Sequence, residues 1–190
     1  MRTMLILFLA SAAVWGGEGD WTVSPRVCID GIDTYTGAED MKFFSAVYFA
    51  ASVSRALSPL FGVEFSAACA THEAAEGDGE DSMGSVKFLP VTLSLQCRPL
   101  PRGRFDVYIG AGGGAVLFRE TSGNLDSLDL PACVTPTAQL GVDWNLTPNL
   151  VLELGARWLW LNTGLEDDGF RLMDLSMDVM ELSLGVGARL

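Results

Sequence analysis

The chain has 190 residues, of which 49% are hydrophobic and 19% charged, and its formal net charge is -12 at pH 7. This length corresponds to a single domain. The strong negative charge excludes nucleic acid as a partner, because such binding depends on neutralising phosphates with basic side chains.

The first 17 residues have the pattern of a secretory signal peptide. Arg2 precedes the apolar run MLILFLASAAVW, and small residues follow that run. We expect cleavage after Ala12, Gly16 or Gly17, and we assign 18–190 to one barrel domain. An uncleaved anchor helix is the alternative, but the apolar run is too short to span a bilayer comfortably.

After the signal peptide, apolar and polar residues alternate with a period of two, which is typical of strands whose two faces meet different surroundings. No stretch has the period of a clean amphipathic helix. The alternation predicts eight strands, each roughly the 9 to 11 residues that cross a bilayer at a tilt. These strands are 21–30, 43–54, 61–71, 87–98, 104–118, 133–144, 150–160 and 178–190.

The segment NLTPNLVLELGARWLWLNTG (145–164) tests this interpretation. It is apolar enough for a membrane helix, but Glu153 and Arg157 lie in its middle. Each central charge would cost such a helix roughly 2.5 to 3.5 kcal/mol. In a strand, both charges share one face while the leucines and tryptophans share the other. We therefore predict a strand.

The connections between the predicted strands alternate in length. Tight turns at 56–59, 99–103 and 145–148 lie at one end, and long connections at 31–42, 72–86, 119–132 and 162–177 lie at the other. An even number of strands with this alternation is typical of an outer-membrane barrel. The predicted fold is all-β, an eight-stranded antiparallel up-and-down transmembrane β-barrel with short periplasmic turns and longer acidic extracellular loops.

Most of the 24 acidic residues fall in the long connections, if Asp30 and Asp178 at their edges are included. Solvated loops explain this distribution. Binding of calcium or another divalent cation at 76–81 or 166–168 is the alternative, but the first segment lacks the spacing of an EF-hand loop. We assign no metal ligand.

An internal repeat links two of the predicted hairpins. VSRALSPLFGVEFSA (53–67) and VDWNLTPNLVLELGA (142–156) share a turn with proline and an apolar strand that carries one glutamate. The repeat maps the second and third strands onto the sixth and seventh. Shared turn chemistry alone would also give part of this similarity, because proline favours a tight reversal.

Tryptophans indicate which face meets lipid. Trp21 and Trp144 fall near the short-turn rim, and Trp158 and Trp160 nearer the long-loop rim, all on the apolar face. Aromatic girdles of membrane barrels have this placement. A water-soluble eight-stranded barrel such as a lipocalin would instead turn the apolar face inward.

The polar face then lines the lumen, which in an eight-stranded barrel is just wide enough for side chains to fill. We expect the charges to pair across it, with Arg157 or Arg26 against Glu64, Glu153 or Glu181. The predicted lumen network comprises Arg26, Glu64, Asp106, Asp143, Glu153, Arg157, Glu181 and Arg189, accompanied by Tyr48, Thr92, Gln96 and Gln139.

Three segments resemble the OmpW family of small outer-membrane barrels: LPVTLSLQCRPL (89–100), FDVYIGAGGGAVLF (105–118) and GVDWNLTPNLVLELGARWLWLNT (141–163). The chain departs from the family pattern where glycines 112–114 replace an Asn-Tyr pair, where Trp144 replaces a tyrosine and where Leu190 replaces a terminal phenylalanine. The last residues, SLGVGARL, resemble the signal read by the barrel-assembly machinery; the matching positions are Ser183, Gly185, Ala188 and Leu190.

The resemblance implies an integral protein of the outer membrane of a Gram-negative-type bacterium, in contact with membrane lipid and lipopolysaccharide. It implies a narrow conduit for small hydrophobic molecules; a non-transporting structural or surface barrel of the OmpA type is the alternative. A lipid A-modifying enzyme is a third reading, but the single histidine, His72, begins an acidic loop and we expect it to be solvated. We assign no catalytic residue and no cofactor.

Glycines 112–114 more simply relieve packing or let a strand bend than bind phosphate, since no helix follows them. Among the cysteines, Cys28 lies on the polar face, Cys69 and Cys97 on apolar faces, and Cys133 at the start of a strand. An oxidising periplasm permits disulfides and leaves three full pairings open. We expect free, buried thiols.

Overall fold

The computed structural model describes residues 21–35, 41–76, 81–99, 103–123, 132–167 and 170–190. The predicted signal peptide and its cleavage sites lie outside these residues. At the outer ends of several strands the backbone is described but the side chains are not, namely at 33–35, 41–43, 74–76, 81–83, 120–123, 163–167 and 170–175.

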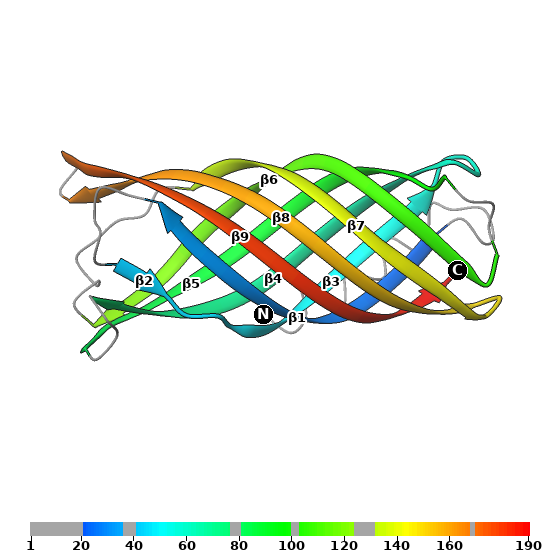
Figure 1. Ribbon diagram of the computed structural model, residues 1–190, viewed down its shortest axis with the longest axis horizontal. Coiled ribbons are helices and arrows are strands. Elements are labelled where there is room, and N and C mark those ends of the chain that lie inside the picture. Colours follow the sequence, from blue (N-terminus) through cyan, green and yellow to red (C-terminus); the bar gives the residue numbers. More distant parts are fainter. Residues whose placement is uncertain (1–20, 36–40, 77–80, 100–102, 124–131, 168–169) are drawn as a thin grey trace.

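The strands form one closed, wholly antiparallel sheet (Figure 1). Around the ring the order is β2-β4-β3-β1-β9-β8-β7-β6-β5, and pairing of β4 with β5 closes it. β2 and β3 pair with successive parts of β4, so they are two parts of one strand of an eight-stranded barrel. The predicted fold is confirmed. The segments are β1 Trp21–Tyr35, β2 Met41–Phe43, β3 Val47–Ala56, β4 Phe61–Glu76, β5 Asp81–Cys97, β6 Phe105–Gly123, β7 Cys133–Thr147, β8 Leu150–Asp167 and β9 Phe170–Arg189.

The strands reach further toward the long-loop end than the sequence predicted. β8 and β9 stay paired from Trp160 and Asp178 up to Asp167 and Phe170, where the long connection 162–177 was expected. The expectation failed because alternation marks only the lipid-facing part of a strand, whereas the backbone ladder continues where both faces meet polar surroundings. At the other end β7 includes residues 145–147, and the turn is only Pro148 and Asn149.

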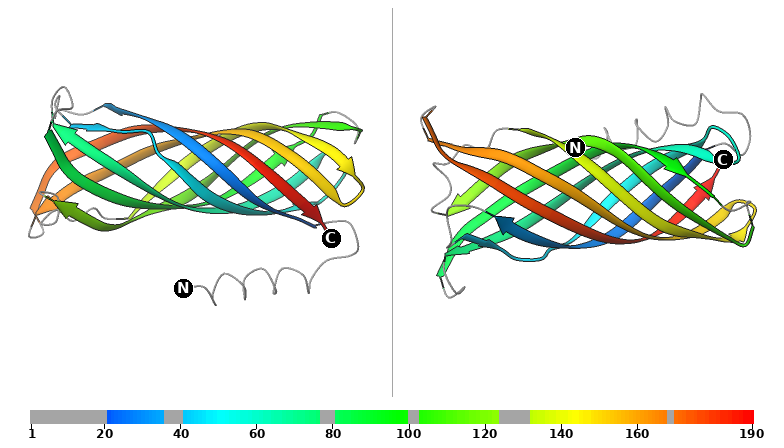
Figure 2. Two further views of the ribbon diagram at one scale, coloured as in Figure 1. Left: turned by 90° about the horizontal axis from the view of Figure 1, so that it is seen from below. Right: turned by 45° about the horizontal axis from the view of Figure 1, so that its top comes forward.

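Each strand has one face toward the interior and one toward the outside (Figure 2). In β8, Glu153 and Arg157 are buried, whereas Leu154 is 60% exposed and Trp160 39% exposed. The most exposed apolar side chains, such as Phe49 and Val134, lie on the outward face of their own strands. Since a barrel that buries its charges and exposes its apolar residues suits lipid rather than water, the sheet is built to sit in a membrane.

The four predicted girdle tryptophans all lie on the outward face. Trp21 and Trp144 are near the short-turn end, and Trp158 and Trp160 lie on β8 nearer the long-loop end.

No helix in the described part of the chain is long and apolar enough to cross a membrane.

The two segments of the internal sequence repeat, 53–67 and 142–156, also have the same structure. In the β3–β4 hairpin, Ser54 pairs with Glu64, and at the corresponding place in the β7–β8 hairpin Asp143 pairs with Glu153. The two hairpins therefore have the same register, and the mapping predicted from the sequence is confirmed. Glu64 and Glu153 are equivalent positions, each projecting into the lumen.

The three consecutive glycines lie where β6 packs closely against β5. A Cβ atom on Gly112 or Gly114 would overlap the carbonyl oxygen of Leu93 or Val91, respectively. A Cβ atom on Gly113 would lie 3.5 Å from its nearest neighbour, the carbonyl oxygen of Thr135, which is an ordinary contact. Two of the three glycines thus relieve packing between strands.

This geometry predicts different effects for neighbouring substitutions. Gly112→Ala should lower the free energy of unfolding by about 1 to 3 kcal/mol, because the overlapping atom is backbone and cannot turn away. Gly113→Ala is the matched control and should be close to wild type. Heat-modifiable gel mobility and urea unfolding in detergent measure both. Equal stability of the two variants would contradict the close packing of β5 on β6.

Candidate functional site in the barrel interior

The interior changes character along the barrel axis. Its short-turn end is polar, its middle carries buried ion pairs, and its long-loop half is filled by apolar side chains. This division of the interior into polar, charged and apolar parts is the structural feature that bears on function.

The middle of the lumen is held by a cluster of two arginines and three glutamates. Nη2 of Arg26 lies 2.6 Å from Oε2 of Glu64, and its Nε donates to Oε2 of Glu153 at 3.0 Å. Arg157 projects from β8, which lies across the barrel from β4, and its Nη2 is 2.7 Å from Oε1 of Glu64. Glu64 therefore accepts from both arginines. All these side chains are at most 7% exposed, so the pairs lie away from bulk water.

Neutral side chains complete the hydrogen bonds of this cluster. Arg157 also donates to Oγ of Ser66 and Oε1 of Gln139. Its Nη1 is 3.7 Å from Oε1 of Glu181, whose other oxygen accepts from the Tyr48 hydroxyl at 2.7 Å. Buried charges are tolerated when their remaining donors and acceptors are satisfied in this way.

Glycines on β7, β8 and β9 make room for the large side chains opposite them. A Cβ atom on Gly185 would meet the side-chain stem of Arg26, and one on Gly141 would overlap the ring of Tyr108. A Cβ atom on Gly187 would come within 2.9 Å of a carboxylate oxygen of Glu153. The narrow lumen can hold the ion-pair cluster because these glycine positions carry no side chain that would compete for the space.

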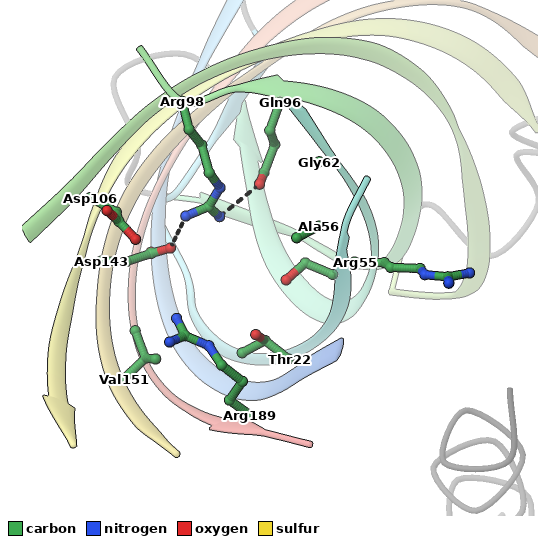
Figure 3. A pocket seen from close by; sticks show the side chains of 11 residues that line it. Thr22, Arg55, Ala56, Gly62, Gln96, Arg98, Asp106, Asp143, Val151 and Arg189 are labelled. Atoms are coloured by element: carbon green, nitrogen blue, oxygen red, sulfur yellow. Dashed lines mark hydrogen bonds and ion pairs between the residues drawn. The ribbon is translucent and has the colours of Figure 1, made fainter. Parts of the chain in front are cut away.

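A second, smaller network lies at the short-turn end (Figure 3). Arg98 donates to Oδ2 of Asp143 at 2.7 Å and to Oε1 of Gln96 at 2.9 Å, and its guanidinium lies 5.2 Å from the ring centre of Tyr108. Burial alone would lower the pKa of Arg98, but the Asp143 carboxylate outweighs it, so the pKa of Arg98 is raised and the group stays charged. Beside this pair is a cavity of about 30 Å³, roughly the volume of one water molecule.

Arg98 is the last residue of the predicted strand 87–98 but was not included in the predicted network; in the structure it lies one residue past the end of β5. The alternation of residues along this strand contained the signal for Arg98. Thr92, Gln96 and Arg98 share one phase of the strand, and the first two are buried in the interior. Continuing that phase by one step would have added Arg98 to the network.

Two residues of the predicted network lie at the rim and make no ion pair within the described residues. Asp106 accepts from the backbone N–H of Gly103 and from the side chain of Asn145. Arg189 donates to Oδ1 of Asn145 at 2.9 Å. The structure thus divides the predicted network into a central group of Arg26, Glu64, Glu153, Arg157 and Glu181, the Asp143 pair with Arg98, and these two rim residues.

The long-loop half of the lumen is apolar, which corrects the expectation of a polar interior throughout. In this half, Thr137 pairs with Leu159 across the β7–β8 ladder. The prediction failed because both faces of this part of β8 are apolar, so alternation could not separate inside from outside. The buried cluster comprises Cys28, Tyr48, Ala50, Ala70, Val86, Phe88, Val116, Cys133, Leu159, Leu161, Met177 and Val179, with Ile32, Ala46, Ala68 and Phe118 packed against it.

His72 is buried in this apolar half, so the expectation of a solvated loop histidine is wrong. It is 1% exposed, its Nε2 is 3.3 Å from Oδ2 of Asp30, and its Nδ1 is 3.1 Å from the carbonyl oxygen of Phe44. Asp30, grouped with the solvated loops in the sequence, is also buried. Because β4 continues to Glu76, His72 falls on the inward face of a strand.

The cysteines are free thiols, and their burial differs from the expectation. Cys28 and Cys133 are buried, whereas Cys69 is exposed on the outside and Cys97 is intermediate. The prediction of buried thiols is therefore wrong for Cys69. Among the described residues, no three histidine, cysteine or acidic side chains converge as metal ligands. The acidic side chains of 76–81 and 166–168 lie outside the described ones.

The C-terminal residues assigned to an assembly signal divide between the two faces of β9. Ser183 and Gly185 point inward, where the Ser183 hydroxyl is 3.5 Å from the carbonyl oxygen of Gly155. Ala188 and Leu190 are exposed on the outside. A role in assembly stays a prediction.

The closed antiparallel barrel, with apolar side chains outside and ion pairs inside, defines a small outer-membrane β-barrel protein. The model of the OmpW family matches residues 22–180. The chain therefore belongs to the OmpW family, and the family resemblance is confirmed. A comparison with curated protein sequences found no match.

Solved outer-membrane proteins have the same fold. OprG from Pseudomonas aeruginosa gives a TM-score of 0.71 at 18% identity, over 91% of this chain and 96% of that one. AlkL, solved in DMPC lipid bilayers, gives 0.68 at 22% identity, over 92% of each chain. OmpW from E. coli gives 0.63 at 17% identity, over 91% of this chain and 98% of that one. Membership of the OmpW family, together with this shared fold, supports an outer-membrane location.

The contacts of Glu64 predict a specific pattern of energetic coupling. A double-mutant cycle of Glu64→Gln with Arg157→Gln should give a coupling energy of about 1 to 3 kcal/mol in the free energy of unfolding, because the two groups touch in a buried site. The cycle of Glu153→Gln with Arg157→Gln should give a smaller value, since Glu153 instead binds Arg26. Urea unfolding in lipid vesicles measures both, and equal coupling in the two cycles would refute the assigned pairing.

Proposed function

We propose that the protein is a narrow conduit for small hydrophobic molecules, whose apolar long-loop half receives the solute and whose central ion pairs close the lumen. The observation that carries the proposal is the division of the interior into an apolar half and a charged half. An apolar molecule gains roughly 25 cal/mol for each Å² of surface that it buries away from water. The apolar half supplies such surroundings at the end that faces the exterior.

The side chains in this half can rearrange. Met177 and Leu161 are completely or almost completely buried, and Met177 has a flexible, unbranched side chain that adapts to irregular neighbours. Entry of a solute requires these groups to change rotamer while the backbone ladder stays intact. The barrel wall, with paired strands all round, holds the positions of the lining while its side chains move.

The central cluster works against passage of ions and water. Parting Glu64 from Arg26 or Arg157 without replacement would leave a buried charge unpaired, which is strongly destabilising. We therefore infer that the straight aqueous path is closed in the resting protein. Outer-membrane lipid and lipopolysaccharide contact the apolar outer belt in this proposal, and the barrel-assembly machinery inserts the chain.

The apolar lining predicts the direction of two substitutions at one level of the lumen. Leu159→Asn should reduce uptake of a small apolar solute several-fold, because it places an amide in the apolar half. Thr137→Val is the matched control. The Thr137 hydroxyl is buried and has no hydrogen-bond partner, so its removal should leave uptake unchanged or raise it. Uptake by a deletion strain complemented with each variant measures the effect.

Conductance in planar bilayers completes this test. The wild-type protein should show little steady ion conductance while supporting solute uptake. If the deletion strain takes up apolar solutes as fast as the wild type, the conduit is refuted and a structural or surface barrel is supported. Heat-modifiable gel mobility establishes that each variant is folded.

A further inference from the structure

Two arginine–tryptophan pairs occupy the outside of the short-turn rim. The guanidinium carbon of Arg55 lies 5.2 Å from the ring centre of Trp21, and that of Arg104 lies 5.7 Å from the ring centre of Trp144. Trp144 also stacks on Phe105, with ring centres 5.7 Å apart. Both tryptophans are on the outward face, and the close view shows the Arg55 side chain pointing away from the interior (Figure 3). Each pair combines a cation with an aromatic ring at the membrane boundary.

The two pairs lie on opposite sides of the barrel. Trp21 and Arg55 are direct partners across the seam between β1 and β3, and Arg104 accompanies Trp144 at the seam between β6 and β7. Between the two seams lie β1, β9, β8 and β7 in one direction, and β3, β4, β5 and β6 in the other. Arg55 and Trp144 also occupy equivalent positions of the internal repeat. The arrangement is a two-sided feature of the rim.

Arg55 and Arg104 differ from the three arginines that form ion pairs inside the barrel, because no acidic side chain among the described residues pairs with them. Arg26, Arg98 and Arg157 each bind a carboxylate. Within the described part of the chain, no carboxylate forms an ion pair with Arg55 or Arg104. The indole N–H groups of Trp21 and Trp144 also lack a hydrogen-bond acceptor. Both indole nitrogens are buried, so the donors that each pair offers to the outside are those of the arginine guanidinium beside the ring.

We propose that the two pairs bind the phosphate groups of anionic glycerophospholipids in the periplasmic leaflet, one site on each side of the barrel. A guanidinium presents its donors in a planar fork that matches phosphate oxygens. The tryptophan ring holds that fork at headgroup depth while its apolar body packs against the upper part of the acyl chains. The net charge of -12 would by itself repel anionic lipid, so a preference for such lipid requires a local basic site.

The test measures which lipid lies next to the rim tryptophans. Protein extracted from outer membranes, with Trp158→Phe and Trp160→Phe to remove the upper girdle signals, is reconstituted in phosphatidylcholine vesicles. The vesicles contain an equal fraction of either brominated phosphatidylglycerol or brominated phosphatidylcholine, and bromine quenches nearby indole fluorescence. Quenching should correspond to a binding preference for phosphatidylglycerol of about fivefold per site.

Arg55→Gln with Arg104→Gln should bring that preference down to about one, and high salt should weaken it. Arg119→Gln is the matched control, because Arg119 is an exposed arginine on β6 far from this rim. The gel-mobility assay shows that each variant is folded.

Three outcomes would overturn the proposal. These are equal quenching by the two lipids in the parent protein, an undiminished preference in the Arg55/Arg104 variant, and loss of the preference in the Arg119 variant. Inorganic phosphate added at constant ionic strength should have no effect on quenching. If it abolishes the preference, the rim binds free phosphate and the lipid assignment is wrong.

Discussion

The shared use of Glu64 by Arg26 and Arg157 is the interaction on which the rest of the interior depends. A single carboxylate, 2% exposed, accepts from two arginines on different strands, Arg26 on β1 and Arg157 on β8, which β9 separates in the ring. Eight strands leave too little width for an open aqueous channel, so charges placed inside must neutralise one another. The bare backbone at Gly141, Gly185 and Gly187 follows from the same constraint, since it supplies the space that the large side chains need.

The internal repeat organises both the inside and the outside of the barrel. Glu64 and Glu153 are equivalent, and both bind Arg26, so the central cluster is built on repeat-related positions. On the outer surface, the equivalent residues Arg55 and Trp144 each take part in an arginine–tryptophan pair. The β3–β4 and β7–β8 hairpins therefore have the same register, but different neighbouring strands supply the residues that each hairpin contacts.

In the proposed conduit, closure by charge and lining by apolar groups are separate functions of one narrow lumen. The ion pairs fix the middle of the barrel, where rearrangement is costly because every member has a buried partner. The long-loop half is held by non-directional packing, in which side chains can exchange positions at smaller cost. Within this half, the break between β2 and β3 is held to both neighbouring strands: Ala46 donates its N–H to Asp30 on β1, and the carbonyl oxygen of Phe44 lies 3.1 Å from Nδ1 of His72 on β4.

The sequence by itself determined the number of membrane strands, the face that each turns to lipid, and the short-turn end of the barrel. It could do so because a strand between lipid and a polar lumen must alternate with a period of two. It also indicated Arg26, Glu64, Glu153 and Arg157 as inward-facing charges. Only the tertiary structure decided which of them meet, because closure of the ring brings together residues far apart in the chain. The same holds for the apolar half and for His72, where polarity no longer alternates and only the continued backbone ladder defines the inward face.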